Sequence, residues 1–141
     1  MNVLLIEQTH VVYSLAPSDL CSSAVVCFPD SYIIVSKEPS VPFRIDHDPV
    51  PGYNFPDKDV AAGLKNMIAS AKTEENLKAS LMELIGNNGT CVVNFSDYKK
   101  VKVKGFLGAK NLKVSNNAMN YITFSARKEQ GKALANFYSN L

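Results

Sequence analysis

Apolar residues alternate with polar ones, or form short β-rich runs, in the first and last thirds of the chain. Near the N-terminus, "NVLLIEQ" and "HVVYSLA" are rich in strand-forming residues, and "SAVVCFPDSYIIVSK" contains two such runs around Pro29 and Asp30. Proline and aspartate favour turns, so this last segment predicts a β-hairpin. In the last third the pattern predicts four strands, at Thr90–Phe95, Tyr98–Gly105, Asn111–Val114 and Asn120–Phe124.

The middle of the chain has a different pattern. Five of the seven prolines lie between Pro39 and Pro56, which predicts an extended connection because proline lacks a backbone donor. Apolar residues at helical spacing then predict one helix from about Asp57 and a second one capped by Thr73, with "GNNG" at 86–89 ending it. A final helix from about Arg127 has apolar residues along one side: Ala133, Leu134, Phe137, Tyr138 and Leu141.

This order of elements predicts the fold class. A chain of 141 residues is suited to one domain with one core. Consecutive strands followed by an amphipathic helix are typical of an α+β domain. We expect a mostly antiparallel sheet, or a partly open barrel, of seven to eight strands with two inserted central helices and a C-terminal packing helix. Strands occupy 1–38, the proline-rich connector and helices occupy 39–89, and basic strands and the last helix occupy 90–141.

The sequence offers few groups for catalysis or metal binding. His10 and His47 are the two histidines, and the "DHD" around His47 has no second histidine near it. The three cysteines match no zinc spacing, and Cys91 alternates with Val93 in an apolar run, which favours a core position over a nucleophile. Neither a nucleophile elbow nor a phosphate-loop pattern occurs. We therefore expect no enzyme activity, no cofactor and no metal.

The chain also suggests a compartment. Its first residues lack the basic segment of a secretory signal, and its longest apolar runs, such as "VLLI" and "AVVCF", are far too short to span a membrane. An odd number of cysteines in such a chain favours a reducing compartment. We expect a cytoplasmic protein.

Positive charge is concentrated near the C-terminus. The formal net charge is +2, but it is unevenly distributed. Residues 1–97 contain six Lys/Arg and twelve Asp/Glu, giving −6. Residues 98–141 contain nine Lys/Arg and one Asp/Glu, giving +8. No acidic residue lies between Tyr98 and Lys128. Such an asymmetry indicates a polyanionic partner or a contact between acidic and basic parts of the protein.

The lysines follow a strand period. In "KVKVK", Val101 and Val103 alternate with lysines, so the valines face a core and the lysines form a row on the other face. One interpretation is a solvated strand whose lysines block sheet aggregation. The other is a binding surface, because solubility is served equally well by mixed charges and does not require a long acid-free window. The candidate binding residues are Lys100, Lys102, Lys104, Lys113 and Phe106.

The C-terminal part resembles bacterial pleckstrin-homology-like domains. The resemblance lies in "FSDYKKVKVKGFLGAKNLKV" and "NYITFSARKEQGKALANFYSNL", with "DSYIIVSKE" matching more loosely. Twelve positions carry it: Asp97, Tyr98, Val101, Gly105, Gly108, Leu112, Val114, Tyr121, Phe124, Ala133, Leu134 and Phe137. Residues 39–89 depart from the family, which has a short connection there. The resemblance concerns fold more than activity.

Three kinds of partner fit a basic strand face. The first is an acidic protein surface, which includes the acidic half of a second copy of the chain. The second, which the resemblance implies, is anionic lipid headgroups, with Phe106 in "GFLG" either an apolar anchor or a buried residue. Nucleic acid ranks last, because stacking aromatics are scarce near the lysines and the two arginines are Arg44 and Arg127.

Overall fold

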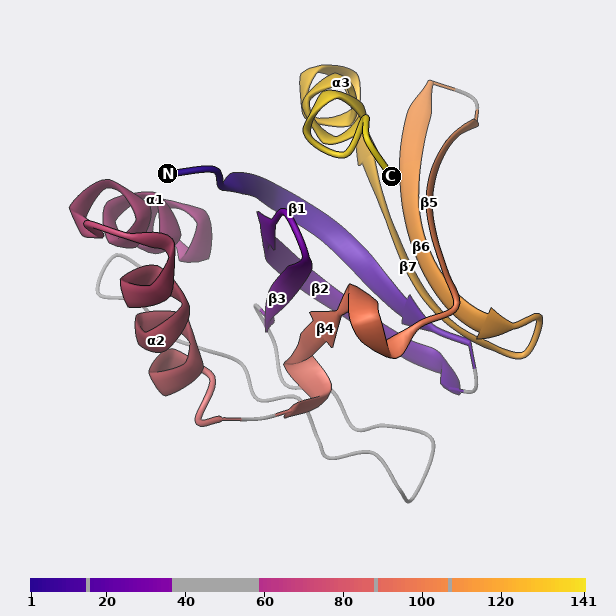
Figure 1. Ribbon diagram of the computed structural model, residues 1–141, viewed down its shortest axis with the longest axis horizontal. Helices are drawn as coiled ribbons and strands as arrows, with labels where there is room; N and C mark the ends of the chain where they lie inside the picture. The colour runs from indigo at the N-terminus through magenta and orange to yellow at the C-terminus, as the bar shows by residue number, and fades with distance from the viewer. Residues whose placement is uncertain (15, 37–58, 88, 107) are drawn as a thin grey trace.

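The computed structural model describes residues 1–14, 16–36, 59–87, 89–106 and 108–141. Seven antiparallel strands form one curled sheet, with three helices packed around it (Figure 1). The strands are β1 Leu4–Tyr13, β2 Ala16–Phe28, β3 Ser31–Ser36, β4 Val92–Asn94, β5 Lys100–Phe106, β6 Ala109–Asn117 and β7 Asn120–Arg127. The helices are α1 Val60–Ser70, α2 Glu74–Leu84 and α3 Lys128–Phe137. The expected α+β class, with an antiparallel sheet of seven strands, is confirmed.

The sheet consists of two meanders joined through β1 and β7, in the order β4-β3-β2-β1-β7-β6-β5. The predicted hairpin is present as β2 and β3, which close on the pair Phe28 and Ser31. The two N-terminal runs belong to one strand, β1, whose register shifts between Ile6 and Thr9. β2 begins at Ala16, well before the predicted hairpin. The sequence pattern missed this early part because "PSD" at 17–19 consists of residues that strands rarely contain.

Both central helices begin at residues whose side chains cap them. The Asp59 carboxylate accepts a hydrogen bond from the Ala62 N–H at 3.2 Å, so α1 begins at Val60 and not near Asp57. Thr73 caps α2 as predicted, and its hydroxyl accepts a hydrogen bond from the Asn76 N–H at 3.1 Å. α1 packs against β1 and α2 at one end of the sheet (Figure 1).

The predicted strand at 90–95 is present but shorter than expected. β4 has three residues and lies between two short 3-10 helices, Gly89–Cys91 and Phe95–Asp97. β6 and β7 are each longer than their apolar runs, because they continue through polar residues on the outer side of the sheet. Strand length is set here by the neighbouring strands, which supply hydrogen-bond partners beyond the apolar segment.

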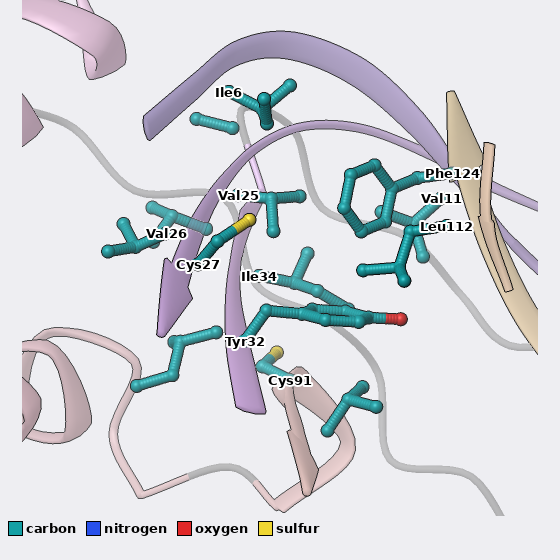
Figure 2. Packing of buried hydrophobic residues seen from close by; sticks show 14 of the residues in the cluster. Ile6, Val11, Val25, Val26, Cys27, Tyr32, Ile34, Cys91, Leu112 and Phe124 are labelled. Carbon is teal, nitrogen blue, oxygen red and sulfur yellow. The ribbon is translucent and has the colours of Figure 1, made fainter. Parts of the chain in front are cut away.

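The concave face of the sheet contains the core. The Tyr32 ring lies between Cys91 and a group formed by Val11, Leu112 and Phe124 (Figure 2). The rings of Tyr32 and Phe124 meet edge to face with centroids 5.0 Å apart, a favourable aromatic geometry. Cys91 is fully buried, so its predicted core position is confirmed.

Helix α3 packs on the sheet beside β1, β6 and β7. Leu134 is fully buried on its inner side, and a Cβ at Gly131 would lie 2.7 Å from the Ala126 carbonyl oxygen, so glycine permits this close approach. The Tyr138 hydroxyl, just beyond the helix, donates a hydrogen bond to the Phe28 carbonyl at 2.6 Å. The expected contribution of Leu141 to this apolar side is wrong, because that residue is 54% exposed.

Candidate functional site

The candidate site lies on the hairpin formed by β5 and β6. The two strands pair without a register shift from Lys100 opposite Ser115 to Phe106 opposite Ala109. Such regular pairing fixes the direction of every side chain on the hairpin, because consecutive residues of a strand point to opposite faces. The hairpin closes near Gly108, whose φ of +79° lies in the region that glycine adopts without strain.

The alternation predicted from the sequence is present in β5. Val101 and Val103 are half-buried and pack against the core. Lys100, Lys102 and Lys104 are exposed on the other face. A strand rises about 3.3 Å per residue, so the Cα atoms of successive lysines are roughly 6.6 Å apart and the row spans about 13 Å.

Lys113 extends the row onto β6. It lies directly opposite Lys102 in the antiparallel register, which places four lysines on one face: Lys100, Lys102, Lys104 and Lys113, hereafter the lysine face. The ammonium nitrogen of Lys113 lies 4.3 Å from the centre of the Tyr121 ring on β7. This cation–π contact offsets part of the repulsion between Lys113 and Lys102, since like charges opposite each other destabilise a strand pair.

A hollow of about 300 Å³ lies among these lysines. Its other described lining residues are Ser115, Asn116, Asn117 and Ala118, at the end of β6 and the start of the following turn. The Asn116 side-chain oxygen accepts a hydrogen bond from the Lys99 N–H at 3.1 Å, which ties this turn to the beginning of β5. The described lining thus combines ammonium, amide and hydroxyl groups with no carboxylate, a composition suited to an anionic group.

A second basic hollow was not predicted from the sequence. It measures about 470 Å³ and lies between the tip of the β5–β6 hairpin and the start of α3. Its described lining residues are Gly105, Gly108, Ala109, Lys110, Lys128, Gly131 and Lys132. Lys132 forms an ion pair with Glu129 at 3.5 Å, so part of the positive charge is compensated. The signal available in the sequence was the cluster of three positive residues at 127, 128 and 132 around one acid.

Phe106, the fifth candidate residue, is the last residue of β5 and pairs with Ala109. The prediction about its side chain lies outside the described residues, as do the expectations for His47 and the "DHD" segment. In the ranges that the structure describes, no three His, Cys, Asp or Glu side chains gather into a group able to hold a metal ion.

The buried thiol at Cys27 is poorly suited to nucleophilic chemistry. Burial raises its pKa to about 12, even though a hydrogen bond with Tyr138 acts in the opposite direction. The reactive species is the thiolate, so a thiol that remains neutral at physiological pH is chemically inert. Cys27 and Cys91 are both buried in the core.

Comparison with known proteins identifies no relative. The chain matches no protein-family model, no curated protein and no solved structure. Within the described part of the chain, no helix has the length and apolar character needed to cross a membrane.

Proposed function

We propose that the protein is a non-catalytic binding module whose lysine face docks on an acidic surface of a partner protein. The observation that carries the proposal is the convergence of Lys100, Lys102, Lys104 and Lys113 around one hollow whose described lining has no acidic side chain. Lysines that served solubility alone would not need to converge, because interspersed charges of both signs achieve the same effect.

Binding by the lysine face would depend on several weak ionic contacts acting together. A single exposed ion pair contributes about 0.2 to 1 kcal/mol, because water and salt screen it. Several charges of one sign on one face also attract an oppositely charged partner over a distance, which raises the association rate. A face of this kind therefore acts on the rate and specificity of encounter more than on the lifetime of the complex.

The proposal includes a pleckstrin-homology-like assignment of the module. The antiparallel meander ends in a helix, α3, that packs on the sheet, which is the order of elements on which the resemblance rests. Helices α1 and α2 remain a departure from that family. We place the module in the cytoplasm, a reducing compartment, and the burial of Cys27 and Cys91 in the core supports this placement.

A protein partner fits the hollow better than a membrane surface does. Each lysine near an anionic lipid surface contributes about 1 kcal/mol, so the four lysines supply roughly 4 kcal/mol, and stable attachment generally takes a second signal such as an acyl chain. A recess lined by amide and hydroxyl groups, in contrast, can accommodate the side chains of a protein surface. Anionic lipid is therefore an alternative outcome of the test below.

The test compares wild-type protein with a triple variant, Lys100→Glu, Lys102→Glu and Lys104→Glu. Both carry the same tag and are used to capture proteins from the native cytoplasm at low and at high salt. Wild type at low salt should retain a set of acidic proteins that the variant loses. High salt should remove the same set, because it shortens the range of the electrostatic attraction.

A second triple variant provides the matched control: Lys72→Glu, Lys128→Glu and Lys132→Glu. It changes the net charge by the same amount at exposed lysines outside the lysine face. The control should retain the wild-type partner set. Equal recovery by all three proteins at both salts, or equal loss by both variants, contradicts the proposal. Binding to phosphatidylserine vesicles without specific protein capture would replace the protein partner with lipid.

A further inference from the structure

The regular spacing of the lysines along β5 favours acidic partners whose carboxylates have the same spacing. Exposed lysines occur at every second residue of β5, and the strand pairs with β6 without a bulge that would break the repeat. The Cα atoms of successive lysines are therefore about 6.6 Å apart along the strand. We propose that the segment recognised by this face is an extended chain with an acidic residue at every second position, an inference that rests on the proposed function.

An extended chain repeats at the same distance as the row. Carboxylates at alternate residues of a strand point to one side and recur about every 6.6 Å, so three of them can face Lys100, Lys102 and Lys104 in register. Acidic residues on one side of a helix recur after three or four residues, which is about 4.5 to 6 Å. Three such residues span about 9 to 12 Å, shorter than the row.

The hollow provides further groups for the same segment. Lys113 and Ser115 lie beside the row on β6 and offer donors to the same segment.

Strand β5 of a second copy is an unsuitable source of this segment. A second copy of β5, paired or stacked on the first, would place lysine against lysine, and like charges in such positions repel. An acidic alternating segment from another protein has the complementary charge and the matching repeat. The lysines thus reject self-pairing while they favour this partner.

The experiment uses two synthetic, fluorescently labelled peptides of identical composition. One alternates three glutamates with three threonines, and the other has its three glutamates in one block followed by its three threonines, so that only two of its glutamates occupy alternate positions. Their affinities for the full-length protein are measured by fluorescence anisotropy at low ionic strength. The alternating peptide should bind wild type roughly three- to tenfold more tightly, because more of its carboxylates meet a lysine.

Two variants test whether the lysine face is responsible for tighter binding of the alternating peptide. Lys102→Ala removes the middle lysine and should bring the alternating peptide close to the affinity of the block peptide. The control Lys72→Ala, at an exposed lysine between α1 and α2, should leave the preference unchanged. Equal binding of both peptides to wild type overturns the inference while leaving the acidic-partner proposal in place. Failure of both peptides to bind also overturns the inference, and the capture experiment then decides the proposed function separately.

Discussion

Residues 100–104 of β5 alternate between the surface and the core. Val101 and Val103 pack inward, and the lysines between them remain in water, so a substitution on one face leaves the other in place. Lys113, on the same face as these lysines, also contacts Tyr121 of the neighbouring strand β7. It holds one ammonium group over a ring at 4.3 Å, and exposed contacts of this type contribute about 0.5 to 1 kcal/mol.

A buried residue gives a prediction that is independent of binding. Burial raises the pKa of Cys27 to about 12 from an ordinary value of 9.0, so the folded state favours the neutral thiol. A pKa raised on folding gives stability that is complete below the unfolded-state value and is lost as pH rises towards the folded-state value. Between pH 9 and 10, the free energy of unfolding of wild type should therefore fall by about 1 kcal/mol more than that of Cys27→Ala.

Chemical denaturation at pH 8, 9 and 10 measures this difference in slope. The alanine variant should be less stable at every pH, because it leaves a small cavity, but its stability should depend less on pH. Tyr32 and Tyr138, whose pKa values burial also raises, act mainly above pH 10 and are present in both proteins. Parallel curves for the two proteins would show that Cys27 ionises as freely in the folded state as in the unfolded one.

At the scale of elements, the Tyr138 hydroxyl joins the end of α3 to the β2–β3 hairpin, at the carbonyls of Phe28 (2.6 Å) and Ser31 (3.3 Å). Tyr138→Phe removes the hydroxyl that donates to the Phe28 carbonyl, and should cost about 1 to 3 kcal/mol because the carbonyl loses its partner in a buried setting. The nearby control Leu141→Ala should change stability by less than about 0.5 kcal/mol, since that side chain is largely exposed. Urea unfolding gives the free energy of unfolding of both variants. Equal losses in the two variants would mean that the Tyr138 hydroxyl does not hold the end of the helix in place.

The elements also show what a sequence pattern can and cannot predict. The hairpin at 24–36, the cap at Thr73 and the inward valines of β5 follow from local rules, and all three are present. The early part of β2 and the full length of β6 and β7 depend on pairing with other strands, which no local pattern contains. The short β4 was overestimated for the same reason, because β3 offers it a partner over three residues.

The candidate site, like the strands, was predictable from the sequence only in part. Strand alternation placed Lys100, Lys102 and Lys104 on one face, and that placement needed no knowledge of the fold. The position of Lys113 opposite Lys102 required the register of the hairpin. The hollow required, in addition, the turn after β6, and the second basic hollow required the packing of α3 against the hairpin tip.

At the scale of the molecule, the lysine face and the acidic helix α2 lie far apart in the described structure (Figure 1). The lysine face lies on β5 and β6, on the opposite side of the molecule from α2, whose acidic residues include Glu74, Glu75 and Glu83 (Figure 1). Such a separation orients a protein in the field of a charged partner before contact. An acidic partner would therefore meet the lysine face first.

The association rate with a captured acidic partner is the measurement that tests the central claim most directly. Stopped-flow mixing gives this rate for wild type and for the triple variant of Lys100, Lys102 and Lys104 to glutamate, over a series of salt concentrations. The wild-type rate should exceed the variant rate by roughly tenfold or more at low salt, and the two should converge as the Debye length falls below about 8 Å. Dissociation rates should differ much less. Equal association rates with the same salt dependence would mean that these lysines are a solvated strand face and take no part in recognition.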